Sequence, residues 1–131
     1  MANHALTSVR DFGEILDYLR DREAGPTALS SIRFCELMGI EAERLAELAT
    51  VYGSATGIAS ASERAQCFIR ASLRVLRAAS DVNGDLGRTI LWFHNEQLAP
   101  FCHQTAEHLV AEGRVEDVIR YVMSLEAGVA G

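Results

Sequence analysis

Three of the four histidines and one of the three cysteines lie close together in the sequence, at His94, Cys102, His103 and His108. Imidazole and thiolate groups are the ligands that Zn²⁺ prefers in proteins. Zinc sites usually pair their ligands at short spacings such as CxxC or HxxxH, and no such pair is present here. We therefore expect no metal site at this cluster and no cofactor in the protein.

Other residues that could perform chemistry also lack the required spacing. Asp81, Asn83 and Asp85 superficially resemble a calcium-binding loop, but the loop glycine is misplaced and no glutamate closes the site. The sequence shows no nucleophile beside a base, no paired carboxylates and no phosphate-binding glycine loop. We therefore expect a protein that is not an enzyme.

The elements that carry these residues are predicted to be helices. Apolar residues recur at three-to-four-residue spacing, and no alternation of useful length indicates a strand. Four residues are expected to cap helices, namely Thr27, Ser60, Asp85 and Thr105. The expected helices cover residues 8–23, 28–38, 41–49, 61–80, a short segment from 86, 106–112 and 115–127. The sequence predicts an all-α fold with an N-terminal domain, 1–80, and a C-terminal domain, 81–131.

Composition restricts the possible partners. The net charge is −6, with 18 acidic residues against 12 basic ones, all of them arginine. This balance argues against non-specific binding to nucleic acid or to anionic membranes. The odd number of cysteines and the lack of a signal peptide or membrane span predict a cytoplasmic protein. Because 49% of the residues are apolar, we expect both a core and a spare apolar surface for a protein partner.

A helix-turn-helix pattern can be read from Arg44 to Ile58. Its second helix would cover 52–58, so Tyr52, Ser54 and Thr56 would be the residues that face DNA. No basic residue lies between Arg44 and Arg64, whereas helices that read DNA present basic or amide side chains to the base edges. We interpret the unit as degenerate and used for packing, and we expect a homodimer through helices 8–58 and weak or absent DNA binding.

The only net basic segment is 61–80, where Arg70, Arg74 and Arg77 share one helical ridge. The ridge could contact phosphate groups. The sequence favours a solvated face on which these arginines pair with acidic residues of the first helix or of a partner subunit.

The last third of the sequence contains a distinctive ordered set of residues. The set is Trp92-Phe93, Asn95-Glu96, Leu98, Phe101, Thr105-Ala106-Glu107, Leu109-Val110, Glu112-Gly113-Arg114, Val118, Tyr121, Leu125 and Gly128. In this order, residues 85–131 resemble the toxin-binding domain shared by antitoxins of the Xre/MbcA/ParS type. In that family the usual partner is a RES-type toxin that degrades NAD or transfers ADP-ribose, and the antitoxin's C-terminal region covers the entrance to the toxin's active site.

The resemblance implies an antitoxin of a type II toxin-antitoxin system, with a helix-turn-helix-like bundle before a small helical toxin-binding domain. The parts that internal packing leaves free are the link 95–104 and the tail after Leu125. The expected toxin-binding residues are Asn95, Glu96, Leu98, Phe101, Tyr121, Met123, Glu126, Gly128, Val129, Ala130 and Gly131. Trp92 and Phe93 are expected to be buried where their helix meets the terminal helix. The alternative is a helix-turn-helix transcription regulator, such as an autorepressor of the same operon.

Overall fold

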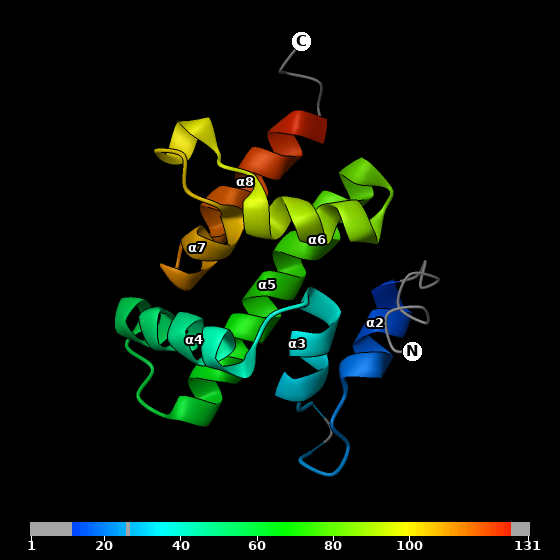
Figure 1. Ribbon diagram of the computed structural model, residues 1–131, viewed down its shortest axis with the longest axis vertical. Helices are drawn as coiled ribbons and strands as arrows, with labels where there is room; N and C mark the ends of the chain where they lie inside the picture. Colours follow the sequence, from blue (N-terminus) through cyan, green and yellow to red (C-terminus); the bar gives the residue numbers. More distant parts are fainter. Residues whose placement is uncertain (1–11, 26, 127–131) are drawn as a thin grey trace.

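The computed structural model describes residues 12–25 and 27–126, and the described residues form helices and short connections without a strand (Figure 1). The elements are α2 (Phe12–Leu19), α3 (Ser31–Met38), α4 (Ala42–Thr56), α5 (Ala61–Asn83), α6 (Leu86–Asn95), the 3-10 turn η1 (Ala99–Phe101), α7 (Ala106–Ala111) and α8 (Val115–Glu126). The predicted all-α fold is confirmed. The predicted start of the first helix, at residue 8, lies outside the described residues.

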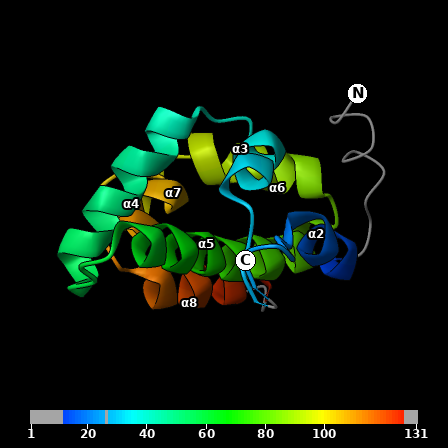
Figure 2. The ribbon, with the colours of Figure 1, turned by 90° about the horizontal axis from the view of Figure 1, so that it is seen from below.

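Helix α5 is the central element of the structure. The Ser60 side chain caps its start by accepting a hydrogen bond from the Glu63 N–H, at 3.4 Å. Gly84 ends the helix in the left-handed conformation, with φ of 73°. Helix α8 lies along one side of α5, and α3 and α4 lie on the other (Figure 2). Because α5 contacts every later helix, it joins the two halves of the chain.

One continuous hydrophobic core surrounds α5. Its members range along the chain from Ile15 to Val122, and its largest fully buried side chains are Phe34, Phe68 and Phe93. Both predicted domains contribute to this core, and α5 extends past residue 80, where the first domain was expected to end. The division into two domains remains a prediction.

The start of α3 differs from the prediction. The N-cap is Ser30 and not Thr27, so the helix begins three residues later than expected. The segment before it is held extended: the Ser30 N–H donates to the Leu19 carbonyl at 2.6 Å. The Gln66 side chain also bonds both the N–H and the carbonyl of Leu29, at 2.9 and 2.7 Å. These contacts with distant residues outweigh the local capping preference of threonine.

The predicted helix-turn-helix at 44–58 is wrong. Helix α4 runs without a break to Thr56, so no turn separates a second helix at 52–58. Gly53 is buried, and a Cβ at this position would overlap the side chain of Arg64, so the glycine permits close contact between α4 and α5. Gly57, with φ of 81°, then ends α4.

A different connection joins two helices at a tight turn. Residues 39–41 link α3 to α4, and Gly39 adopts the left-handed conformation with φ of 71°. Short turns that contain glycine are typical of helix-turn-helix units. Tyr52, expected to face DNA, instead lies partly buried with its ring 6.0 Å from that of Phe68.

Candidate protein-binding site

Helix α6 begins the C-terminal segment, and local chemistry sets its start. The Asp85 side chain accepts a hydrogen bond from the Arg88 N–H at 3.2 Å, as predicted for an N-cap. Phe93 is 1% exposed and is fully inside the core, whereas Trp92 is only partly buried. Helix α6 packs on α5 and α7. The expected contact of these two aromatic residues with the terminal helix remains a prediction.

The link 95–104 is an ordered loop pinned by Leu98. The Leu98 N–H donates to the Gln104 carbonyl at 2.9 Å, and the Leu98 carbonyl accepts from the His103 N–H at 3.0 Å. Leu98 was expected to contact the toxin, but its side chain is 2% exposed and lies in the core. It therefore holds the link in place, and the exposed residues of the link are the ones that a partner can reach.

Cys102 and His103 lie at the exposed bend of this link. Both adopt the left-handed conformation, with φ of 58° and 63°. Residues other than glycine enter this region at a cost, and such residues are concentrated at functional sites. The bend is therefore a surface feature that the rest of the link must hold in shape.

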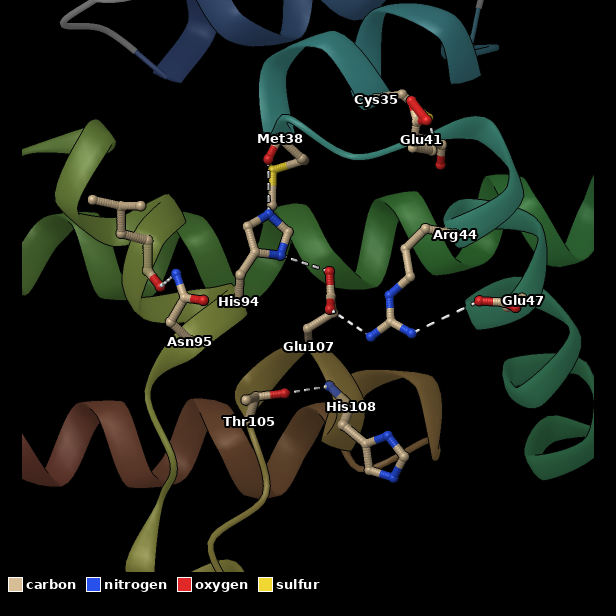
Figure 3. Close-up of polar contacts among 11 residues, drawn as sticks. Cys35, Met38, Glu41, Arg44, Glu47, His94, Asn95, Thr105, Glu107 and His108 are labelled. Carbon is tan, nitrogen blue, oxygen red and sulfur yellow. Dashed lines mark hydrogen bonds and ion pairs between the residues drawn. The ribbon is translucent and has the colours of Figure 1, made fainter.

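A polar cluster around the buried Glu107 ties the C-terminal segment to α3 and α4, and the Arg44 side chain in it is 46% exposed (Figure 3). Glu107 of α7 is 4% exposed, and its carboxylate accepts hydrogen bonds from Arg44 of α4 at 3.0 Å and from His94 Nδ1 of α6 at 2.7 Å. His94 Nε2 lies 2.9 Å from the Met38 carbonyl at the end of α3. One carboxylate thus connects three helices, and through His94 it reaches a fourth.

The charge state of Glu107 follows from these contacts. Burial raises the pKa of the Glu107 carboxyl, but the hydrogen bonds and positive charges of His94 and Arg44 outweigh burial and lower the pKa below its ordinary value. Both ring nitrogens of His94 already have partners, so neither is free to serve a substrate as a base. We interpret the cluster as a structural clamp.

We predict that Glu107→Gln destabilises the protein by about 1.5–3 kcal/mol at pH 7, because the amide loses the charge-assisted bonds to Arg44 and His94. A depressed folded-state pKa adds stability that is fully present above the unfolded value of about 4.3 and is lost as the pH falls through the folded value. The difference between wild type and variant should therefore shrink as the pH drops below about 4.3. Urea unfolding of both proteins at several pH values measures this difference in stability.

The matched control is Glu112→Gln, which removes a more exposed carboxylate that pairs with His108 at 3.2 Å. This variant should unfold within about 1 kcal/mol of wild type. Equal stability of Glu107→Gln and wild type at pH 7 would contradict the clamp.

The four residues considered for zinc lie in three different settings. His94 belongs to the clamp, His108 pairs with Glu112, and Cys102 and His103 lie at the bend of the link. Among residues 12–25 and 27–126, no group of three His, Cys, Asp or Glu side chains could hold a metal ion.

The residues that resemble a calcium loop form hydrogen bonds within the connection between α5 and α6. Asn83 donates from Nδ2 to the Thr89 hydroxyl at 3.2 Å, and Asp85 caps α6. Residues 81–85 therefore end one helix and begin the next.

The exposed surface of the C-terminal segment is apolar at the end of α8. Met123 is 57% exposed and Leu125 is 38% exposed. We call these two residues the α8 tip. Earlier in the helix, Val118 and Val122 are fully buried. The α8 tip is thus an apolar surface. The side chain of Glu126, also expected to bind the toxin, lies outside what the structure describes.

The other predicted contact residues lie at different depths. Tyr121 is partly buried, with its ring 5.8 Å from that of Phe101, and Arg114 lies 5.1 Å over the Phe101 ring. Asn95 and Glu96 are exposed at the end of α6. Gly128, Val129, Ala130 and Gly131 lie outside the described residues.

Sequence reasoning missed the clamp and the exposure of Leu91, which is 63%. Arg44 and Glu107 are separated by 63 residues, so no local pattern could pair them. A signal for Glu107 does exist, because α7 has only six residues and its neighbours Ala106, Leu109 and Val110 are fully buried. An acidic side chain in so short and so buried a helix must find an internal partner.

Comparison with protein-family models, with curated proteins and with solved structures finds no match to this chain. Within the described part of the chain, every helix is too short or too polar to cross a membrane.

Proposed function

We propose that this protein is an antitoxin that binds a RES-type, NAD-consuming or ADP-ribosylating toxin and blocks the toxin's active site sterically. The observation that carries the proposal is the α8 tip, where two large apolar side chains stay exposed at 57% and 38%. Apolar anchors of this kind dominate interface energies, and methionine adapts to irregular partner surfaces. The ordered set of residues that resembles Xre/MbcA/ParS-type antitoxins ends in this same segment.

The sequence after the α8 tip supports the choice of partner. An enzyme that acts on NAD must hold a diphosphate, and basic side chains are the usual means. Glu126 follows Leu125 in the sequence. We expect its carboxylate to compete with the substrate for these basic groups.

The structural role of the clamp supports a partner-binding protein without chemistry of its own. His94 and Glu107 satisfy each other, and neither lines the two cavities described below. The clamp fixes α6 and α7, and α7 holds α8 in turn. A firmly held surface loses less conformational entropy on binding.

Co-expression of the full chain with a RES-type product of a neighbouring gene tests the proposal. We expect cells that carry both proteins to keep their NAD and to grow, whereas cells with the toxin alone lose NAD. Loss of NAD in both strains, or neighbouring genes without a RES-type product, would contradict the antitoxin function.

We propose that DNA binding by this chain is weak or absent, against the alternative of a transcription regulator. In helix-turn-helix proteins the helix after the turn enters the major groove. Here the first turns of α4 and the residue before them present Glu41, Glu43 and Glu47, all exposed. Carboxylates on this surface repel phosphate groups. Salt-resistant binding to its own promoter DNA, measured by fluorescence anisotropy, would favour the regulator instead.

We also propose that two copies associate through the N-terminal helices. An apolar groove of about 850 Å³ lies between α3, α4 and the start of α5. Ile32 is 76% exposed at this groove. A protruding residue beside a groove on one surface is suited to a two-fold interface, in which each copy fills the other's groove. Such an arrangement also brings Arg64 of one copy towards Glu36 or Glu41 of the other, since all three line the groove.

We predict that Ile32→Glu converts the dimer to a monomer, because it places a charge in the apolar interface. Sedimentation equilibrium at tens of micromolar protein measures the change. Leu91→Glu, at another apolar residue that is mostly exposed (63%) on α6, should leave the dimer intact. A monomeric wild-type protein would contradict the groove interface.

A further inference from the structure

A second cavity gathers one third of the arginines of the chain. It has a volume of about 350 Å³ and lies between α2, the segment that follows α2, and the middle of α5. Of the 12 arginines in the sequence, four line it, namely Arg20, Arg70, Arg74 and Arg77. Among the described residues that line it, none is acidic. In a protein with a net charge of −6, this cavity is a local concentration of positive charge.

The arginines are only partly neutralised. Arg74 pairs with Glu116 of α8 at 2.9 Å, and Arg20 lies 3.9 Å from Asp17. The predicted pairing of the α5 ridge with the acidic residues of the first helix is therefore corrected, because Arg74 reaches α8 instead. Arg70 and Arg77 have no carboxylate partner among the described residues.

Two of these side chains are held in position without being neutralised. Arg70 donates a hydrogen bond to the Thr27 carbonyl at 2.6 Å. The guanidinium group of Arg77 lies 6.0 Å from the centre of the Phe12 ring. A carbonyl and an aromatic ring orient a guanidinium group but leave its charge available. The cavity thus presents two oriented positive charges.

The floor of the cavity is apolar. Leu29 and Leu73 are buried core residues, and Leu16 packs partly buried against the same core. An inorganic anion such as phosphate carries polar oxygens on every side. The oxygens that faced this apolar floor would have no hydrogen-bond partner. A molecule with an anionic end and an apolar body matches both halves of the cavity.

We propose that this cavity binds a small amphipathic carboxylate. Its carboxylate lies against Arg70 and Arg77, whose planar guanidinium groups match the two oxygens. Its apolar body lies on Leu16, Leu29 and Leu73. The volume is at the lower end of the range for small-molecule sites, about 300–1,000 Å³, so the ligand is short. The site is independent of the proposed toxin-binding surface, and its test does not require a toxin.

The experiment is calorimetric titration of the full chain with octanoate as the probe. Acetate supplies the charge without the apolar body, and 1-octanol supplies the apolar body without the charge. We expect saturable one-to-one binding of octanoate that is at least tenfold tighter than binding of either control. In methyl NMR spectra, the resonances of Leu16, Leu29 and Leu73 should shift with octanoate. Absence of saturable binding, or shifts confined to the 850 Å³ groove, would overturn the proposal.

Variants distinguish binding by Arg70 and Arg77 from non-specific electrostatic attraction to the protein. The double variant Arg70→Gln/Arg77→Gln should weaken octanoate binding at least tenfold, while Arg88→Gln should leave it unchanged, because the Arg88 side chain is 82% exposed on α6. Circular dichroism melting checks that both variants fold. Equal octanoate affinity in the double variant and the wild type would refute the assigned site, and the wild-type titration decides the matter if the double variant does not fold.

Discussion

Replacing both Met123 and Leu125 with glutamate is expected to weaken toxin binding by about 10³-fold, from two interface anchors each worth about 2 kcal/mol. Both side chains are exposed, at 57% and 38%, so the fold should tolerate the change. A glutamate in an apolar interface also leaves a charge without a partner. The affinity for purified toxin, measured by calorimetry, and the NAD content of co-expressing cells report the effect.

The matched control for this double variant is Val51→Glu on α4. Val51 is 41% exposed, close to the value for Leu125, but α4 lies on the opposite side of α5 from α8 (Figure 2). This control should bind toxin as the wild type does. If the double variant is folded and still protects cellular NAD, the α8 tip is not the contact surface.

Phe93→Ala is expected to destabilise the protein by about 3–5 kcal/mol. Phe93 is 1% exposed and lies in the core where α6 packs on α5 and α7. Because small domains are stable by only about 5–15 kcal/mol, the variant should unfold near physiological temperature or at low urea. The free energy of unfolding, measured by urea titration followed by circular dichroism, tests this value.

Trp92→Ala provides the comparison for Phe93→Ala. The two residues are neighbours on α6, but Trp92 is only partly buried, so its removal leaves a smaller cavity. We expect a clearly smaller loss of stability than for Phe93→Ala. The reverse order would show that Trp92, and not Phe93, holds α6 to the core.

Local chemistry made much of the fold predictable. The caps at Ser60, Asp85 and Thr105 are observed, and in each case the side chain accepts a bond from an N–H three residues later. The helix expected over 61–80 is observed as part of α5, and its apolar residues from Phe68 to Ala79 recur at helical spacing and are buried. Capping and helical periodicity depend on residues within one or two turns, so the sequence alone specifies them.

The errors occurred where distant residues decide local structure. Thr27 is a good cap, but Gln66 fixes Leu29 in an extended conformation and moves the helix start to Ser30. The turn expected between two helices near residue 50 is also absent, because α4 continues through Gly53, over which Arg64 packs. Propensity is a weak guide where tertiary contacts compete with it.

The candidate site was also predictable only in part, because some of its features depend on contacts between distant residues. Met123 was expected to be available to a partner, and its side chain is exposed in the structure. Leu98 was misassigned because the pairing of its backbone with Gln104 and His103 in the link has no periodic signal. The clamp between Arg44 and Glu107 joins helices that are distant in sequence, and only the packed structure brings them together.

Steric blocking of the toxin's active site is the central claim, and inhibition of purified toxin tests it most directly. NAD consumption by the RES-type toxin is followed while the full chain is added in increasing amounts. The account predicts complete inhibition near one chain per active site, and a higher apparent inhibition constant when the NAD concentration is raised. Undiminished NAD consumption at a tenfold excess of the chain would contradict the account.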